Sequence, residues 1–237
     1  MTSGFPGFPA EMAQFFRGLK RNNRREWFQP RKELFEQQVK GPMRELVLAL
    51  NSTLSKFAPD YIADPKKAIF RIYRDTRFSH DKTPYKTHIA AHFGRRGTAL
   101  SGGGLYFSVS NDTIEVAGGI YHPAPETLLA VRTHIAGNHE ELRAILKHNK
   151  VKKLFGGIVG DELSRVPKGF DACHPAADLI KKKDWLLDVT LEPSIATTPA
   201  LFKNLTEHFR AMHPFVEFLS RPLAAKKPAR DLLEFHR

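Results

Sequence analysis

The chain has little cysteine and no long apolar run. Cys173 is the only cysteine among 237 residues, so no disulfide can form within the chain, and we expect a reducing compartment. The longest apolar run, Leu46–Leu50, is far shorter than the roughly 20 residues of a membrane-spanning helix. Residues 1–9 lack the basic and apolar segments of a signal peptide. These absences predict a cytoplasmic protein without a membrane partner.

Motifs of the common metal and catalytic sites are also missing. The sequence holds no H-E-x-x-H, C-x-x-C or P-loop pattern, and we expect no dedicated metal site. His88 and His92 lie four residues apart on a predicted strand, roughly 13 Å, which is too far to share a metal ion. Ser79-His80-Asp81 and Cys173-His174 contain nucleophile and base types, but sequence neighbours do not reproduce the geometry of a triad or nucleophile pair.

Acidic residues are outnumbered. There are 37 Lys and Arg against 25 Asp and Glu, a formal net charge of +12, which favours nucleic acid, phosphorylated small molecules or acidic surfaces as partners. Residues 17–32 contain seven basic residues and one acid, Glu26. Such a run is either a solvated helix face or an anion-binding rim, and solvated faces are the commoner case.

The hydrophobic pattern predicts an α+β protein with a central, mostly antiparallel sheet of four to six strands and helices from both chain ends packed on it. Predicted strands, from alternating apolar residues, are 67–73, 87–93, 105–110, 113–119 and 185–191. Predicted helices are 10–20, 24–57 with a break at Gly41-Pro42, 126–136, 140–148 and 198–219, with a short one after His174-Pro175. Residues 151–170 are expected to be irregular.

We expect one domain over residues 1–222. It comprises a helical part (1–60), a sheet-containing core (61–192) and a C-terminal helix (193–222). Residues 223–237, rich in Ala, Lys and Pro, are expected to form a flexible tail.

The segment 67–94 carries the densest charge. Its loop holds five cations, two carboxylates and hydroxyl groups, namely Arg71, Arg74, Arg77, Lys82, Lys86, Asp75, Asp81, Ser79 and Tyr85. Guanidinium forks and ammonium groups suit a phosphate or a dicarboxylate. Asp75 and Asp81 would orient the arginines, or hold Mg²⁺ beside a phosphate. In the competing interpretation these acids pair with loop cations, as Arg74–Asp75 and Asp81–Lys82, and only fix the fold. Five cations, however, exceed what two acids need.

Three further positions are candidates for the same ligand site. Gly118 and Gly119 end a predicted strand and would allow close approach of a ligand, or serve only the bend. Lys168, in a Pro-led turn, would add a cation or lie on the surface. The weak candidates for proton transfer are Asp81, Lys82 and Tyr85, with no motif behind them.

The run F-R-I-Y-R-D-T-R-F-S-H-D-K-T-P-Y-K-T (70–87) resembles the signature of an uncharacterised bacterial and fungal family, domain of unknown function 2461. Other matching pieces, in order along the chain, are F-x-x-L-x-x-N-N-x-x-x-W-F ending at Phe28, G-G-I-Y-H-P from Gly118, Arg132, P-K-G-F from Pro167, and His174-Pro175. The resemblance covers roughly residues 5–220. It implies no activity, but it does imply that these scattered motifs converge in space.

The resulting hypothesis is a pocket protein that binds an anionic small molecule through the charged loop; whether it is an enzyme stays open. One alternative is a nucleic-acid-binding module using residues 17–32, 147–153 and 181–183 as a continuous basic patch. The sequence argues mildly against it, because the loop cations are not interleaved with a run of exposed aromatic residues. A second alternative is a scaffold that docks an acidic protein, with a purely structural charged loop.

Overall fold

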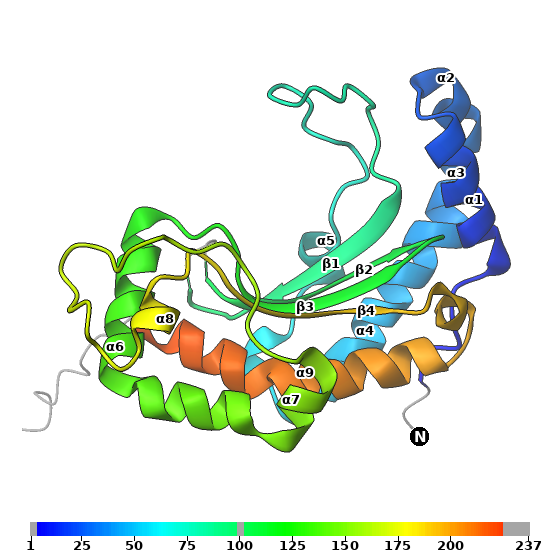
Figure 1. Ribbon diagram of the computed structural model, residues 1–237. Coiled ribbons are helices and arrows are strands. Elements are labelled where there is room, and N and C mark those ends of the chain that lie inside the picture. The colour runs from blue at the N-terminus through cyan, green and yellow to red at the C-terminus, as the bar shows by residue number, and fades with distance from the viewer. Residues whose placement is uncertain (1–3, 99–101, 225–237) are drawn as a thin grey trace, which may run out of the picture.

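A computed structural model describes residues 4–98 and 102–224 (Figure 1). Most of the predicted tail, residues 225–237, lies outside the described residues. The α-helices are α1 (Ala10–Arg21), α2 (Arg25–Phe28), α3 (Lys32–Phe35), α4 (Gly41–Leu54), α5 (Pro65–Ala68), α6 (Pro125–Lys147), α7 (Asn149–Phe155), α8 (Ala177–Ile180) and α9 (Ala200–Ser220).

The sheet has four antiparallel strands in the order β1-β2-β3-β4, which confirms the predicted α+β class. The strands are β1 (His88–Gly94), β2 (Gly104–Ser110), β3 (Ile114–Ile120) and β4 (Trp185–Leu191). Each strand predicted at 87–93, 105–110, 113–119 and 185–191 appears within a residue or so, because its side chains alternate between a buried and a polar face.

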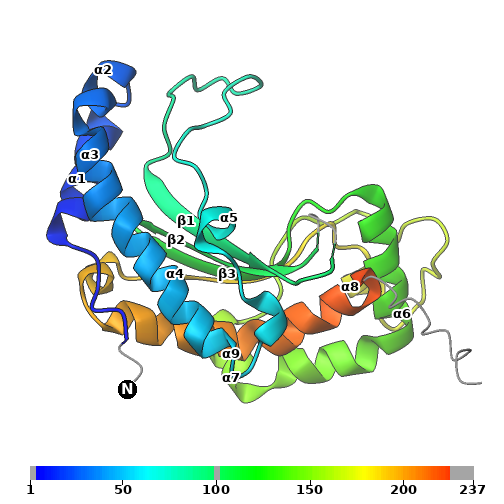
Figure 2. The same cartoon turned by 180° about the vertical axis from the view of Figure 1, so that it is seen from behind.

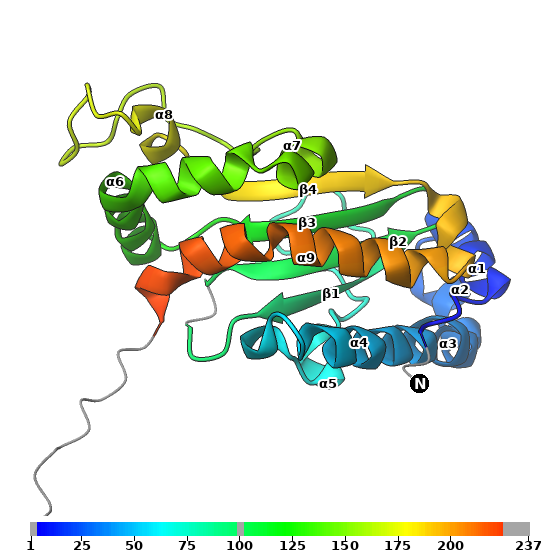
Figure 3. The same cartoon turned by 90° about the horizontal axis from the view of Figure 1, so that it is seen from below.

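One face of the sheet is covered by helices. The apolar stripe of α9 packs against β2 and β3, while α4 lies beside β1 and α6 and α7 lie beside β4 (Figure 3). Phe107 and Val116 point into this layer and are fully buried. Within the described residues no helix crosses the opposite face of the sheet, which we call the open face (Figures 1 and 2).

The N-terminal helices form a rod along the β1 side of the sheet. The segment from α2 to α4 is continuous, with a 3₁₀ turn at Gln29–Arg31 and a π-helical turn at Glu36–Lys40. The π-helical turn lies immediately before Gly41-Pro42, where the sequence predicts a break and where Pro42 supplies no N–H group to the helix.

Two sequence-based predictions are wrong, one for a strand and one for an irregular segment. Lys67 and Ala68 end α5, whose start is fixed by Pro65 and by the Asp64 side chain accepting the Lys66 N–H, so 67–73 is not a strand. Residues 69 and 73 make only isolated bridges. The predicted division between helices 126–136 and 140–148 is confirmed, because α6 is interrupted at Asn138, whose backbone (φ −136°, ψ 26°) is not helical. The start of the segment predicted to be irregular is helical, in α7.

Gly119 should tolerate no side chain. Its φ is +138°, and a Cβ there would lie 1.9 Å from the carbonyl oxygen of Trp185 on β4. We expect Gly119→Ala to lower the free energy of unfolding by about 2–4 kcal/mol in urea titrations. The control Gly157→Ala, whose added methyl group would have open space for 4 Å around it, should change it by less than about 1 kcal/mol. If the two variants lowered the free energy of unfolding equally, this account of Gly119 would be wrong.

Candidate functional site

Residues 71–87, which we call the arm, rise from the outer edge of β1 beside α1–α3 (Figure 1). The arm is an antiparallel ribbon: the Arg74 amide donates to the Pro84 carbonyl (2.9 Å) and the Lys86 amide to the Ile72 carbonyl (2.7 Å). At its base the Phe70 amide donates to the Ala90 carbonyl of β1 (3.0 Å). The ribbon is therefore an extension of the sheet.

Asn23 joins the arm to the N-terminal helices. Its side-chain nitrogen donates to the Tyr85 carbonyl (2.8 Å), and its side-chain oxygen accepts the Tyr85 amide (3.1 Å). The Tyr85 ring stacks on Phe28 of α2 with centroids 4.2 Å apart, and the residue is only 1% exposed. The resemblance segment N-N-x-x-x-W-F thus has a structural role: it positions the arm.

The carboxylates of the arm are held by arm residues. Asp75 accepts two bonds from the Arg77 guanidinium (3.0 and 2.7 Å), and these bonds lower the Asp75 pKa to about 2. Asp81 accepts the Thr83 amide (2.9 Å) and pairs with Arg74, and these bonds likewise lower its pKa to about 2.

The pairs therefore differ from the Arg74–Asp75 and Asp81–Lys82 partners that sequence adjacency suggests. Lys82 instead donates to the Thr76 carbonyl (2.9 Å). Three of the five arm cations are thus engaged inside the arm, as the structural interpretation of the loop expects. A magnesium ion on Asp75 or Asp81 would have to displace these donors.

Arg71 and Lys86 differ from the other arm cations in their partners. No carboxylate among the described residues lies within ion-pair distance of either one. Lys86 lies over the ring of Phe70, 5.0 Å from its centroid. Burial and the nearby positive charge of Arg71 both lower the pKa of Lys86. Two like charges therefore meet at the base of the arm.

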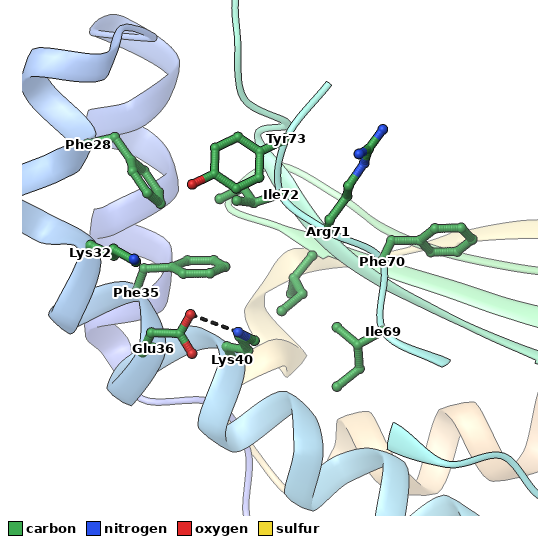
Figure 4. A pocket seen from close by; sticks show the side chains of 11 residues that line it. Phe28, Lys32, Phe35, Glu36, Lys40, Ile69, Phe70, Arg71, Ile72 and Tyr73 are labelled. Carbon is green, nitrogen blue, oxygen red and sulfur yellow. Dashed lines mark hydrogen bonds and ion pairs between the residues drawn. The ribbon is translucent and has the colours of Figure 1, made fainter. Parts of the chain in front are cut away.

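Figure 4 shows the other side of this region, a cavity of about 210 Å³ between the arm and α3. Tyr73 lies near Phe28 there, and Lys40 pairs with Glu36 at 2.8 Å. The Arg71 side chain points away from this cavity (Figure 4). A second cavity, of about 320 Å³, is lined by Arg74 and Lys86 of the arm and by Lys20 and Asn23 of the N-terminal helices.

The open face of the sheet is polar where it meets the arm. The strand register places His88, Ser108 and Glu115 on this face, and Ser108 donates to Glu115 at 3.1 Å. His92 and Tyr106 are cross-strand partners on the same face. Phe70 contacts Tyr106, with ring centroids 6.2 Å apart. This face therefore begins directly beside Lys86 and Phe70.

Burial shifts the ionisable groups of this face. Burial lowers the pKa of His88, with Lys86 adding to the effect and Glu115 opposing it, and burial alone lowers the pKa of His92. Burial also raises the pKa of Tyr106. Both imidazoles are thereby favoured in the neutral form, which can accept as well as donate a proton.

Sequence reasoning missed this polar face as a site. The signal was available in the alternation itself: His88, Ala90 and His92 face away from Ile89, Ala91 and Phe93. Without the register, however, the alternation does not show that Tyr106, Ser108 and Glu115 lie on the same side. Within the described residues no cluster of three or more His, Cys, Asp or Glu side chains is arranged to hold a metal ion.

The structure does not bring Gly118, Gly119 or Lys168 to the arm. A Cβ on Gly118 would lie 2.3 Å from the Met212 sulfur, so Gly118 serves close packing on α9. Gly119 pairs with Gly104, which in turn pairs with the last residue of β1. Gly119 therefore lies roughly 20 Å along the sheet from His88, the first residue of β1. Lys168 is exposed in the loop before α8, at the far end of the sheet (Figures 1 and 3).

The other predicted residues of the arm lie as follows. Ser79 is at the arm tip, where its amide donates weakly to the Thr76 carbonyl (3.4 Å). Of the proton-transfer candidates, Tyr85 is buried against Phe28, while Asp81 and Lys82 are engaged at the tip. The geometry therefore favours His88, His92 and Tyr106 over these three for proton transfer.

The scattered resemblance segments do not all converge on one place, because the segment that begins at Gly118 lies at the other end of the sheet from the arm. The arm and the N-N segment meet through Asn23. At the other end of the sheet, the His122 amide donates to Asp184 (2.6 Å), and the buried Arg132 donates to the Lys182 carbonyl (2.9 Å). The open face lies between these two groups.

The two hydrogen bonds between Asn23 and Tyr85, which we call the Asn23 clamp, predict that the position of the arm depends on one side-chain amide. Asn23→Ala removes both bonds to Tyr85 and should lower the free energy of unfolding by about 1–3 kcal/mol. It should also raise the amide hydrogen-exchange rates of residues 72–86 measured by mass spectrometry. The control Gln37→Ala, which removes only a surface bond to Glu33, should change neither. Unchanged exchange in Asn23→Ala would contradict the clamp.

His92 predicts a dependence of stability on pH. Because its pKa is lowered in the folded state, the unfolded chain binds more protons just below the ordinary histidine value of about 6.5. Stability should therefore be lost as pH falls from 6.5 towards the lower folded value. We expect His92→Gln to flatten the fall in melting temperature between about pH 7 and pH 5. His80→Gln, at the exposed arm tip, is the control, and identical profiles for wild type and His92→Gln would refute the prediction.

In the part of the chain that the structure describes, none of the helices has the length and apolar character of a membrane span.

Comparison with known proteins identifies the family. No curated protein matches the chain, and no solved structure matches it. The sequence profile of the family described as "Conserved hypothetical protein (DUF2461)" matches residues 11–218, which include the arm, the sheet and most of α9. The chain therefore belongs to the DUF2461 family.

Proposed function

We propose that this protein binds an anionic ligand, one that carries a phosphate or carboxylate group, at the base of the arm. Arg71 and Lys86 supply the positive charge, and His88 is the neighbouring hydrogen-bonding group. The observation that carries the proposal is that neither Arg71 nor Lys86 has a carboxylate within ion-pair distance among the described residues, whereas Arg74 and Arg77 each have one. The charges of Arg71 and Lys86 interact, and the charge of Arg71 also acts on Asp75.

The electrostatic argument is simple. Bringing two positive charges together costs free energy, and partial burial of Lys86 increases this cost. An anion held between the two cations would remove the repulsion and gain two charge-assisted hydrogen bonds. Phe70 beneath Lys86 stabilises the ammonium group only in part, since a cation–π contact is worth about 0.5–2 kcal/mol.

The remaining arm cations support the fold instead. Arg77 and Arg74 hold Asp75 and Asp81, and Lys82 caps the Thr76 carbonyl. The structural interpretation of the loop thus accounts for its tip and the anion-binding interpretation for its base.

Thermal shift measurements test the proposal. Inorganic phosphate, pyrophosphate and citrate are titrated against the wild type and against Arg71→Ala/Lys86→Ala at constant ionic strength. At least one anion should raise the melting temperature of the wild type, and the double variant should lose most of that increase, because both cations are gone.

Arg77→Ala is the matched control. It also removes one exposed arm cation, but one that already has an internal partner, Asp75. The proposal expects this variant to keep the anion-induced shift. If no anion stabilises the wild type, or if Arg77→Ala loses the shift as fully as the double variant does, the proposal is wrong.

A further inference from the structure

The arm exposes aromatic rings among its cations. Phe78 at the tip is 94% exposed, and Phe70 at the base is 45% exposed. Between them in sequence lie Arg71, Arg74 and Arg77. The structure therefore removes the sequence-based argument against nucleic acid, which was that the loop cations are not interleaved with exposed aromatic residues.

The ring of Phe78 has no apolar partner in the described structure. Its neighbour is the guanidinium of Arg77, 5.7 Å from the ring centroid. The tip around it is held by the Asp75–Arg77 and Asp81–Thr83 bonds and by Lys82. The arm thus exposes one large apolar ring to water on a hydrogen-bonded support, with a guanidinium beside it.

Aromatic rings and cations lie together at the tip of the arm and again at its base, an arrangement that suits a strand of nucleotides. Phe78 and Arg77 stand at the tip, while Phe70, Arg71 and Lys86 gather at the base. Residues 71 to 78 span at most roughly 25 Å of chain, enough for several nucleotides. Unpaired bases stack on exposed aromatic rings, and cations beside the rings contact the phosphates.

A basic wall faces the arm. Lys20 of α1 lines the same cavity as Arg74 and Lys86 but pairs with Asp112 at 2.7 Å, and Asp81 also lines that cavity. The uncompensated charge on this side therefore comes from Arg24 and Arg25, which are exposed. In Figures 1 and 2 the helices α1–α3 stand beside the arm, so both surfaces would be within the field of one polyanion.

We infer that the anion bound between Arg71 and Lys86 is a backbone phosphate of a single-stranded nucleic acid. One nucleobase of the same strand stacks on the ring of Phe78. This inference rests on the proposed anion site at Arg71 and Lys86 and names its substrate class. An anionic membrane surface is the less favoured partner, because Phe78 is the single exposed apolar ring at the tip and Phe70 lies at the base, away from any surface that the tip would enter.

Fluorescence anisotropy with labelled 12-nucleotide oligothymidine and oligouridine tests the inference. Phe78→Ala should weaken binding by about 5- to 100-fold, the effect typical of one stacked base. It should leave the salt dependence of the affinity unchanged. Arg71→Ala/Lys86→Ala should instead make the slope of log affinity against log salt shallower by about 0.7 for each phosphate that the variant no longer neutralises. Tyr121→Ala removes a ring that is 67% exposed at the other end of the sheet and should bind like the wild type.

The outcomes separate this inference from the proposed function. If neither oligonucleotide binds while phosphate still stabilises the protein through Arg71 and Lys86, the inference is wrong and the anion site stands. If neither oligonucleotide binds and none of phosphate, pyrophosphate and citrate stabilises the protein, both are wrong. Full affinity in Phe78→Ala, or Phe78-dependent binding to phosphatidylserine vesicles without oligonucleotide binding, would also overturn the inference. Because Phe78 makes no packing contact in the core, its variant should fold, and circular dichroism checks this.

Discussion

Ion pairing inside the arm determines which of its charges are left for a ligand. Asp75 and Asp81 neutralise Arg77 and Arg74 and fold the tip around themselves, and Lys82 caps a carbonyl group. Only Arg71 and Lys86 remain near each other without a carboxylate in the described structure. The same acids that make the arm a well-bonded support therefore also concentrate the uncompensated charge at its base.

The fold places that charge beside a polar surface. Helices α4, α6, α7 and α9 gather on or beside one face of the sheet, and the arm and α1–α3 rise on the other side (Figures 1 and 3). His88 is both the first residue of β1 and a neighbour of Lys86, so the proposed anion site and the open face meet at one residue. From the proposed anion site the open face continues to His92 and Tyr106; burial lowers the pKa of His92 and raises that of Tyr106.

Local sequence patterns predicted the fold well, but they did not predict how the charges of the arm pair or which residues share the open face. Strands β1 to β4 follow from side-chain alternation, which is a property of neighbouring residues. The segment 67–73 failed because Pro65 and Asp64 start a short helix that the alternation conceals. The partner choice in the arm, Arg77 for Asp75 and Arg74 for Asp81, depends on how the ribbon turns, and spacing does not encode it. The register that joins His88, Ser108 and Glu115, and the exposure of Phe78, are likewise properties of the folded chain.

The pKa of Lys86, measured by NMR titration of its side-chain nitrogen, tests the central claim most directly. The account predicts a value below the ordinary 10.5, a rise towards it in Arg71→Ala, and a rise in the wild type when phosphate is added. Arg77→Ala should leave the Lys86 pKa where it is in the wild type, because Asp75 already pairs with Arg77. A Lys86 pKa at the ordinary value, unaffected by Arg71→Ala and by phosphate, would contradict the account.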